Sequence, residues 1–479
     1  MIQYRNREIP FIHLFKSVSG YYLYDVNRDK FLEISRAVYE ALESEKMGEC
    51  IEGLSDVVIN EIDLLKKKGY LKSSHVVCSK HPKTDMSKYY IENSIRHLIL
   101  QVTQNCNLRC EYCIYSGEYR NRTHSEKQMP FNVAKKAIDY YVNHSRDNES
   151  LSIGFYGGEP CMNFKLIKQC VEYVKKNVEG RTVAYHMTTN ATLLDEEKIR
   201  FFKEHDFSIL VSLDGPKEIH DKHRKFVFSR QGSYDVVLEK IKYIKEKYPD
   251  YCKQRISFNM VIDTENNFSI INEFVKNNDI VSDLRYQANY IDPKNTDVER
   301  KTNPIYIEEI YYEKFKLFLE LLGKIPKGHV SPLLNNYENE IREFLYDNDN
   351  SLILNLPQEC HHSGPCIPGN TRLFVNADGV YYPCERVSEN TQEAIIGNIN
   401  NGININAVHR VLNYEQEAKT LCYTCWAYRH CDQCIAHKDN NLDNIKKNCD
   451  ITKRNLLEKM KDACTLSKLG FDYYIEYDN

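Results

Sequence analysis

The sequence has no long run of hydrophobic residues. Its longest apolar stretches, such as residues 209–213, have the length of a β-strand and are far shorter than the roughly 20 residues that cross a bilayer. The N-terminus also lacks the basic-then-apolar layout of a signal peptide, so we expect a cytoplasmic protein. Low-complexity segments and solenoid repeats are absent as well, which excludes a disordered linker protein or a repeat array.

An excess of one charge is missing too. The 64 Lys and Arg residues nearly balance the 68 Asp and Glu residues, for a formal net charge of −4. Nucleic acid and membrane surfaces are therefore not expected as partners, because both attract basic proteins. Hydrophobic residues make up 42% of the 479 residues, which predicts a folded chain of two or three domains.

Cysteine is abundant, with 17 residues. An odd number in a chain without a secretory signal argues against a disulfide framework. Eleven of them fall into spaced groups, and grouped cysteines in a reducing compartment are more often metal ligands or catalysts. The other six are expected to be mostly small buried residues: Cys50, Cys78, Cys161, Cys170, Cys252 and Cys464.

The hydrophobic pattern divides the chain into four regions. Residues 1–80 contain three short alternating runs and then helical spacing that ends at Gly69, which predicts a small winged-helix-like unit. Residues 95–295 alternate six strand patterns with helical ones; this predicts an α/β fold with a parallel sheet, either a barrel or a doubly wound sheet. Residues 296–355 form a helical bridge to a Cys-rich segment at 356–479.

The first cysteine group follows the first strand of the α/β region. It is Cys106, Cys110 and Cys113 in the run CNLRCEYC. Closely spaced thiolates on one loop bind iron clusters, and three ligands leave one iron of a four-iron cluster open for catalysis. A structural zinc loop is the alternative, although zinc would need a fourth ligand.

This CxxxCxxC spacing, with Tyr112 before the last cysteine, resembles the signature of the radical S-adenosylmethionine (SAM) superfamily. The resemblance implies a partial (β/α)6 TIM-like barrel with a [4Fe-4S] cluster held by the three cysteines. In that family the open iron chelates SAM, which is cleaved to a 5′-deoxyadenosyl radical that removes a substrate hydrogen. The resemblance also puts Tyr112 near the adenine.

Polar residues at the next strand ends fit the same resemblance, since ligands of such sheets bind at the carboxyl ends of the strands. GGEP resembles the family motif that binds the SAM amino group, and later strand ends resemble positions that hold the ribose and carboxylate. Asp214 could be a turn former or a base, and Val261 could pack on adenine or in the core. The candidate SAM contacts are Gly157, Gly158, Glu159, Pro160, Thr189, Asn190, Ser212 and Arg224.

Eight more cysteines, enough for two sets of four, lie between residues 360 and 449. Zinc is an alternative ligand, because zinc ribbons also use paired CxxC knuckles. The pattern resembles the SPASM extension, which carries two auxiliary [4Fe-4S] clusters, except that its last pair is separated by two residues rather than three. The resemblance assigns Cys360, Cys366, Cys384 and Cys434 to the first auxiliary cluster, and Cys422, Cys425, Cys431 and Cys449 to the second. Some relatives leave the iron at the position of Cys360 open for substrate.

The N-terminal unit resembles the recognition element that binds leader peptides by adding a strand to a sheet edge; a purely structural appendage is the alternative. Recognition element, barrel and SPASM extension in this order resemble the maturases that form thioether crosslinks in ribosomally made, Cys-rich peptides (the sactipeptide and ranthipeptide group). The resemblance implies three [4Fe-4S] clusters, SAM, a Cys-rich precursor peptide and a low-potential electron donor such as flavodoxin or ferredoxin.

Three other functions stay open. Two are radical SAM reactions: carbon–carbon crosslinking of a peptide, and oxidation of a sulfatase residue to formylglycine, against which the N-terminal unit argues. The third is a zinc-stabilised peptide-binding protein without catalysis. The substrate sequence, the acceptor carbon, the number of crosslinks and the oligomeric state do not follow from these residues.

Overall fold

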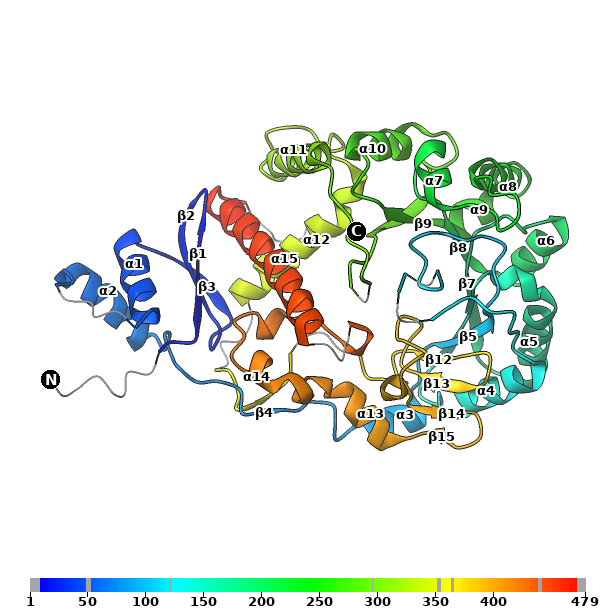
Figure 1. Cartoon of the computed structure of the whole chain (residues 1–479), viewed down its shortest axis with the longest axis horizontal. Helices are drawn as coiled ribbons and strands as arrows, with labels where there is room; N and C mark the ends of the chain where they lie inside the picture. The colour runs from blue at the N-terminus through cyan, green and yellow to red at the C-terminus, as the bar shows by residue number, and fades with distance from the viewer. Residues whose placement is uncertain are drawn as a thin grey trace.

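The computed structural model describes residues 9–48, 53–116, 118–119, 122–294, 296–350, 355–362, 366–437 and 442–471. Cys50, which the sequence predicted to be buried, lies outside them. A small N-terminal sheet lies at one end of the molecule and a large α/β body at the other, with the long helix α15 (Leu442–Lys468) between them (Figure 1).

In the described part of the N-terminal unit, three strands are followed by two helices; the sequence predicted three strands and two or three helices. The strands form an antiparallel sheet in the order β1-β2-β3, and Ser35 caps the first helix by accepting a hydrogen bond from the Val38 amide. The second helix ends just before Gly69, whose φ of +85° is the left-handed conformation that glycine favours. The elements are β1 (Ile12–Ser17), β2 (Gly20–Asp25), β3 (Lys30–Ile34), α1 (Arg36–Lys46) and α2 (Asp56–Lys67).

The α/β body is built on six parallel strands that lie side by side in chain order, from β5 to β10. Each was expected from its apolar run, and the parallel sheet with helical crossovers confirms the α/β prediction. Among the described residues the strands are β5 (Leu98–Thr103), β6 (Ser150–Gly157), β7 (Thr182–Thr189), β8 (Ser208–Ser212), β9 (Ile256–Ile262) and β10 (Arg285–Tyr290).

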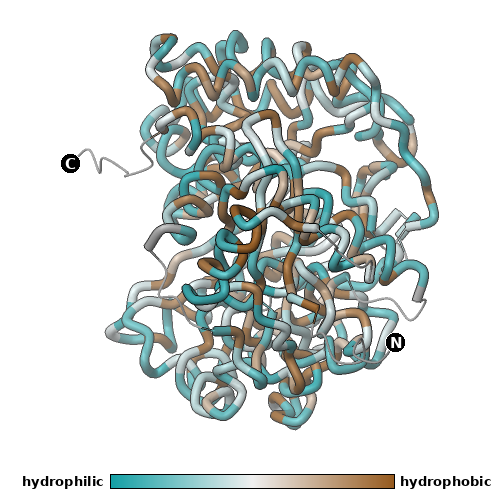
Figure 2. The backbone as a smooth tube through the Cα atoms, turned by 90° about the vertical axis from the view of Figure 1, so that its left-hand side faces the viewer, coloured by the Kyte–Doolittle hydropathy of each residue, from teal (hydrophilic) through white to brown (hydrophobic). Residues whose placement is uncertain are grey.

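Helices follow the strands and cover the outer face of the curved sheet (Figure 1). Their apolar residues and the strands form one large core, and hydrophobic residues alternate with hydrophilic ones along the helices (Figure 2). Two short helices, α7 and α9, were not expected from the sequence. The helices are α4 (Phe131–Asn143), α5 (Phe164–Asn177), α6 (Glu196–Glu204), α7 (Lys217–His223), α8 (Tyr234–Lys247), α9 (Pro249–Arg255) and α10 (Phe268–Asn277), with the 3-10 turn η1 (Pro160–Asn163).

The sheet continues beyond β5 into the Cys-rich segment. Strand β12 (Leu373–Val375) pairs parallel to β5, with Leu373 opposite Leu98. Strands β13 (Val380–Tyr382), β14 (Gly397–Asn398) and β15 (Gly402–Ile403) then add antiparallel. The C-terminal segment therefore extends the same sheet, a pairing that the sequence did not predict.

A two-stranded sheet and several helices connect the N-terminal unit to the Cys-rich segment. Strand β11 (Glu359–Cys360) pairs with β4 (Cys78–Ser79), and α12 packs against α15 and β3. The other described elements are α3 (Ser87–Asn93), α11 (Pro304–Leu321), α12 (Asn335–Asn350), α13 (Ile405–Leu412), α14 (Lys419–Cys422) and the turns η2 (Pro332–Leu334), η3 (Gln392–Ala394), η4 (Tyr414–Ala418), η5 (Tyr428–His430) and η6 (Ile435–His437).

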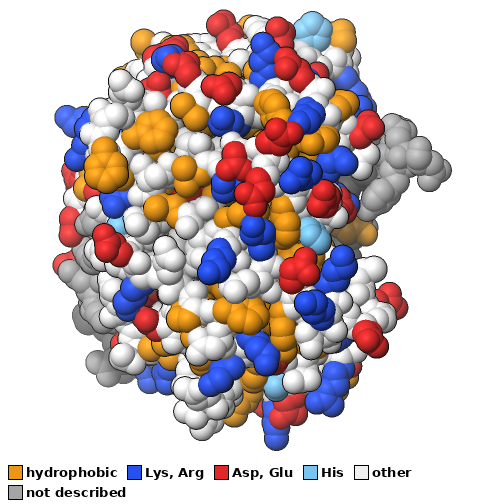
Figure 3. All heavy atoms as spheres, turned by 90° about the vertical axis from the view of Figure 1, so that its right-hand side faces the viewer, with side chains coloured by type: hydrophobic (Ala, Val, Ile, Leu, Met, Phe, Trp, Pro, Cys, Tyr) orange, Lys and Arg blue, Asp and Glu red, His pale blue; other side chains and the backbone are white. Residues whose placement is uncertain are grey.

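The surface carries both charges. On the face shown in Figure 3, acidic and basic side chains are interspersed, and neither sign forms a continuous field. No helix within the described ranges is both long and apolar enough to span a bilayer.

Candidate active site and metal centres

The first three cysteines lie on the loop that follows β5. Cys110 is buried, and Cys106 and Cys113 are partly exposed. The Cys106 sulfur accepts a hydrogen bond from the Leu108 amide at 3.4 Å. Burial, together with the charges of the neighbouring cysteines, raises the pKa of the Cys106 thiol and brings that of Cys110 to about 12. The three thiols therefore share one low-dielectric site.

Gly157 and Gly158 hold this loop against the end of β6. The Gly158 amide donates to the Thr103 carbonyl at 3.0 Å, and the Glu159 amide donates to the Asn105 carbonyl at 2.8 Å. A Cβ atom would lie 2.1 Å from the Thr103 oxygen at Gly157, and 2.1 Å from the Asn105 oxygen at Gly158. Only glycine permits so close an approach, so the GG pair positions the cysteine loop.

Glu159 joins the ends of β6 and β7. Its carboxylate is fully buried and accepts hydrogen bonds from the Thr189 hydroxyl at 2.7 Å, the Asn190 amide at 2.8 Å and the Cys161 amide at 3.0 Å. Burial raises the pKa of Glu159, and the three hydrogen-bond donors offset only part of this increase. Both oxygens are engaged inside the protein, so Glu159 orients the next strand end, and Pro160 begins the turn η1.

Asn190 extends this network to the cysteines. Its side-chain amide donates to Asn107 at 3.0 Å and lies 3.7 Å from the Cys106 sulfur. Thr189 and Asn190 are both buried at the end of β7. The structure thus brings the GGEP motif, the β7 end and the first cysteine together, as the sequence predicted.

Asp214, two residues after β8, organises the opposite side of the site. It pairs with Arg224 through two contacts, Oδ2 to Nε at 2.7 Å and Oδ1 to Nη2 at 3.0 Å. It also accepts hydrogen bonds from the Tyr112 hydroxyl and from the Val261 amide. Burial alone would raise the pKa of Asp214, but the Arg224 guanidinium brings it below its usual range. Asp214 is therefore an ionised anchor rather than a base.

Arg224 connects this anchor to the cysteines. Its Nη1 atom lies 3.9 Å from the Cys110 sulfur, and its guanidinium lies over the Tyr112 ring, 5.4 Å from the centroid. A buried cation at that place favours negative charge on the sulfur. Ser212 ends β8 beside this group, in register with Asn259 of β9 and 9% exposed.

His223 and Asp263 are site residues that the sequence reasoning missed. His223 is buried and bridges Glu111 at 3.0 Å and Asp263 at 2.9 Å, and its ring packs edge-on against Tyr112. Asp263 directly follows β9. Its place at a strand end was the one signal that could have found it.

Comparison with known proteins agrees with this geometry. Residues 100–276 match the sequence model of the "Radical SAM superfamily". The cysteine-type anaerobic sulfatase-maturating enzyme of Clostridium novyi is 27% identical over 369 residues, which cover 73% of this chain and 90% of that protein. Residues 100–276 form a radical SAM domain. The chain is related to the anaerobic sulfatase-maturating enzymes.

Two further similarities extend over most of this chain. The radical SAM cyclopropyl synthase TigE of Paramaledivibacter caminithermalis is 23% identical over 406 residues, 80% of this chain and 78% of that protein. The solved structure of native anSMEcpe with bound AdoMet superposes with a TM-score of 0.53 and 21% identity, covering 76% of this chain and 98% of that one. The latter similarity bears on the fold.

The radical SAM site has the donor set that a four-iron cluster and SAM need. The pKa values of the three thiols are all raised, chiefly by burial in the protein, and a metal centre would stabilise them as thiolates. Three protein ligands leave one iron for SAM. The residues present therefore fit a [4Fe-4S] cluster with Cys106, Cys110 and Cys113 as its ligands.

Seven of the eight later cysteines form two groups in space. Besides burial, the charge of Cys434 raises the pKa of the Cys384 thiol, and the charge of Cys366 raises that of Cys434. Cys384 and Cys434 also pack on the same apolar cluster. The second group is Cys422, Cys425, Cys431 and Cys449. Burial raises the pKa of all four thiols, to about 12 for Cys422 and Cys431, and neighbouring cysteines add to the increase in three of them, Cys422, Cys431 and Cys449. None of the sixteen described cysteines forms a disulfide.

Cys360 lies apart from the group to which the sequence assigned it. It packs against the same apolar cluster as Cys422 and Cys425, whereas Cys384 and Cys434 pack against another. Its thiol pKa is raised by burial and by Asp29 and Glu415, against Arg429. The structure thus brings Cys366, Cys384 and Cys434 together as a group of three.

Proposed function

We propose that this enzyme installs thioether crosslinks in a ribosomally made, Cys-rich peptide, using a leader-binding N-terminal unit, a radical SAM site and two auxiliary [4Fe-4S] clusters. The observation that carries the proposal is the packing of the N-terminal sheet on the Cys-rich segment. Phe11, Phe15 and Tyr24 belong to the same apolar cluster against which Cys422 and Cys425 pack. A peptide held by this sheet would be held beside the auxiliary cysteines.

The sheet is suited to strand addition. It has three strands, so β1 and β3 are its two edges. One face packs against α1 through Leu23 and Val38, and the other against α15 through Phe15 and Met460. With both faces covered, an extended peptide would add at an edge, where backbone hydrogen bonds supply affinity.

Near the cysteine loop, this chain's residues exclude water and fix charge. When bound, the cluster and SAM supply one-electron chemistry that ends in a 5′-deoxyadenosyl radical. Asp214 holds Arg224 and Tyr112 in place beside Cys110, and Glu159 holds Asn190 beside Cys106. These two braces fix the mouth of the barrel from opposite sides.

The proposed reaction balances as follows. One C–H bond and one S–H bond of the peptide are broken and one C–S bond is formed. The carbon-bound hydrogen leaves as a hydrogen atom to the 5′-deoxyadenosyl radical, which becomes 5′-deoxyadenosine, and the thiol loses a proton. One electron remains from the carbon radical and the thiolate, and the auxiliary clusters would accept it. The proposed protein ligands are Cys366, Cys384 and Cys434 for the first auxiliary cluster, and Cys422, Cys425, Cys431 and Cys449 for the second.

Mass spectrometry tests the proposal. The enzyme is co-expressed without oxygen with a Cys-rich peptide encoded beside its gene. Each thioether should remove two hydrogens, about 2 Da, and one alkylatable cysteine, and should survive disulfide reduction. Cys106→Ala should abolish the product, whereas Cys170→Ala, a buried cysteine of α5 away from the site, should retain it. A crosslinked peptide from Cys106→Ala would refute the proposal.

Carbon–carbon bond formation is the second candidate, because the likeness to the cyclopropyl synthase TigE extends over 80% of this chain. It would give the same loss of two hydrogens with every thiol still free. Sulfatase maturation is less well supported, since about a quarter of this chain lies outside the match to the Clostridium novyi enzyme.

A further inference from the structure

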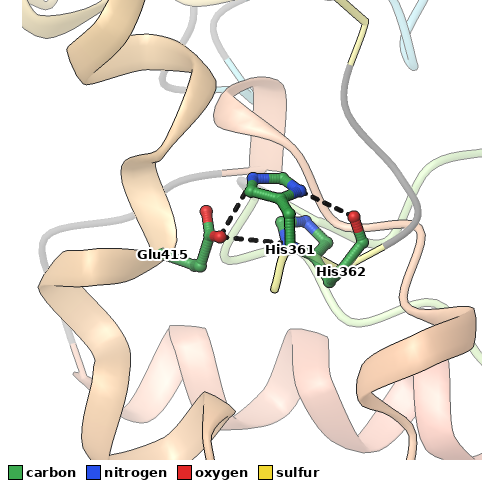
Figure 4. A group of neighbouring side chains, drawn as sticks. All are labelled: His361, His362 and Glu415. Atoms are coloured by element: carbon green, nitrogen blue, oxygen red, sulfur yellow. Dashed lines mark hydrogen bonds and ion pairs between the residues drawn. The ribbon is translucent and has the colours of Figure 1, made fainter. Parts of the chain in front are cut away.

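Three buried side chains from two separate segments of the Cys-rich region meet in one cluster. His361 and His362 directly follow β11, and Glu415 lies in the turn η4. They point toward one another in Figure 4. His361 is 9%, His362 5% and Glu415 2% exposed, so the cluster is closed to bulk water.

Backbone carbonyls contact both histidines. His362 Nε2 lies 2.7 Å from the Gln433 carbonyl; a carbonyl accepts only from N–H, so this nitrogen carries a proton and the neutral ring keeps its lone pair on Nδ1. His361 faces carbonyls with both nitrogens, Nδ1 at 2.7 Å from His362 and Nε2 at 2.9 Å from Leu412. Its Nε2 would therefore give up its proton when a cation binds. Such N–H to carbonyl contacts are how metal-bound histidines are held.

One nitrogen of each histidine faces the same carboxylate. His361 Nε2 lies 2.9 Å and His362 Nδ1 3.6 Å from Glu415 Oε1. These separations bracket about 3.3 Å, the distance between neighbouring ligands on a tetrahedral zinc ion with bonds of about 2.0 Å. The three ligand atoms all lie within 4.8 Å of one another.

Two atoms of the cluster are left without a hydrogen bond. They are His362 Nδ1 and Glu415 Oε2. A buried acceptor without a partner costs about 1–3 kcal/mol, and both atoms would be satisfied by one cation. A proton on His361 Nε2, shared between Glu415 and the Leu412 carbonyl at 2.9 Å, is the alternative occupant, but it leaves His362 Nδ1 without a donor.

We propose that His361, His362 and Glu415 bind one divalent cation of the zinc class, separate from the iron–sulfur sites. Two imidazoles and one carboxylate favour zinc-like ions over magnesium or calcium, which prefer oxygen ligands alone. The ion would join β11, η4 and the Gln433 segment, and so fix the two auxiliary cysteine groups relative to each other. The Ser79 hydroxyl, which donates to Glu415, would orient the carboxylate. This inference does not depend on the proposed function.

Metal analysis with X-ray absorption tests the site. The full chain is treated with a chelator, loaded with zinc and freed of excess zinc. We expect about one zinc per chain, with nitrogen and oxygen neighbours at about 2.0–2.1 Å. His362→Gln and Glu415→Gln should each lose this zinc and keep the iron content. His81→Gln is the matched control, because its ring contacts His361 at 5.0 Å between centroids without contributing a ligand.

Several outcomes would overturn the proposal. The first is no retained zinc in the wild type. The second is zinc surrounded by sulfur at about 2.3 Å, which would put the metal on cysteines. The third is zinc that persists in both variants. If the variants do not fold, the neighbours of zinc in the wild-type spectrum alone decide between these results.

Discussion

At the scale of single residues, Asp214 makes contacts that the sequence did not predict. It holds Arg224, Tyr112 and the Val261 amide at once. Asp214→Asn leaves the Arg224 charge buried without its partner, a change that typically costs about 3–5 kcal/mol. We expect a loss of that size in the free energy of unfolding, measured by denaturant titration without oxygen.

Asp206→Asn is the control for this prediction. Asp206 pairs with Arg255 on the surface, and the two side chains are 65% and 39% exposed. Exposed pairs contribute less than about 1 kcal/mol. If both variants lost equally little stability, Asp214 would not anchor the site.

Gly158 gives a steric prediction. A methyl group there would lie 2.1 Å from the Asn105 oxygen and 3.0 Å from the Cys106 amide nitrogen, so the cysteine loop must move. Gly158→Ala should lower stability by roughly 1–3 kcal/mol and release the iron of the first cluster, measured by iron content. Gly180→Ala controls for the iron content: nothing lies within 4 Å of its added Cβ, and its φ of +72° strains only its own turn. Equal iron in both variants would contradict the steric account.

Cys360 can be separated from its neighbours by substitution. Because Cys366, Cys384 and Cys434 form a group of three and Cys360 packs elsewhere, we expect Cys360→Ala to keep its iron. Cys384→Ala should lose about four irons per chain, as counted by metal analysis. Loss of the same four irons from Cys360→Ala would instead make it a ligand.

At the residue scale, the sequence predicted those site residues that lie close together along the chain. Cys106, Cys110 and Cys113 share one loop and span only seven positions, so their spacing alone predicts a shared cluster. The roles of Glu159 and Asp214 were not readable. Each acts through hydrogen bonds to residues on other strands, and such contacts leave no local pattern.

At the scale of elements, the N-terminal sheet is attached to the Cys-rich segment through Asp29. Its carboxylate contacts His430 at 3.0 Å and Tyr24 at 2.6 Å. Burial would raise the pKa of Asp29, but His430 and Tyr24 lower it to about 2. A lowered folded-state pKa stabilises the protein above the ordinary value near 4, and this contribution is lost as the pH falls from about 4 toward 2.

Trp426 reports this attachment. It is the one tryptophan of the chain, and its ring stacks on His13 of β1 with centroids 3.8 Å apart. Asp29→Asn should loosen the sheet at pH 7, shift Trp426 emission to longer wavelength and speed hydrogen exchange in β1–β3. Glu40→Gln, which removes an exposed pair with Arg36 in the same unit, should change neither. Unchanged emission in Asp29→Asn would contradict the attachment.

Elements with a local period were predictable. The strands β5–β10 and most helices of the α/β body match their apolar patterns because those patterns follow each element's own burial. The pairing of β12 with β5 was not, since Leu373 and Leu98 are far apart in sequence and a three-residue strand carries little periodicity. The short helices α7 and α9 were missed for the same reason.

For the whole molecule, the number of irons per chain tests the proposed set of three clusters. Three four-iron clusters require about twelve irons and as many sulfides per chain. Removing Cys106, Cys110 and Cys113 together should leave about eight. A colourless protein that holds only zinc would refute the cluster assignment and favour a binding protein without catalysis.

The ladder between β5 and β12 has a further consequence. The strand that leads into the Cys106 loop and the strand that leads toward Cys384 are neighbours in one sheet, so no hinge separates these two cysteine sites. Electron tunnelling falls off steeply with distance, and a ladder of backbone hydrogen bonds keeps that distance constant from one turnover to the next.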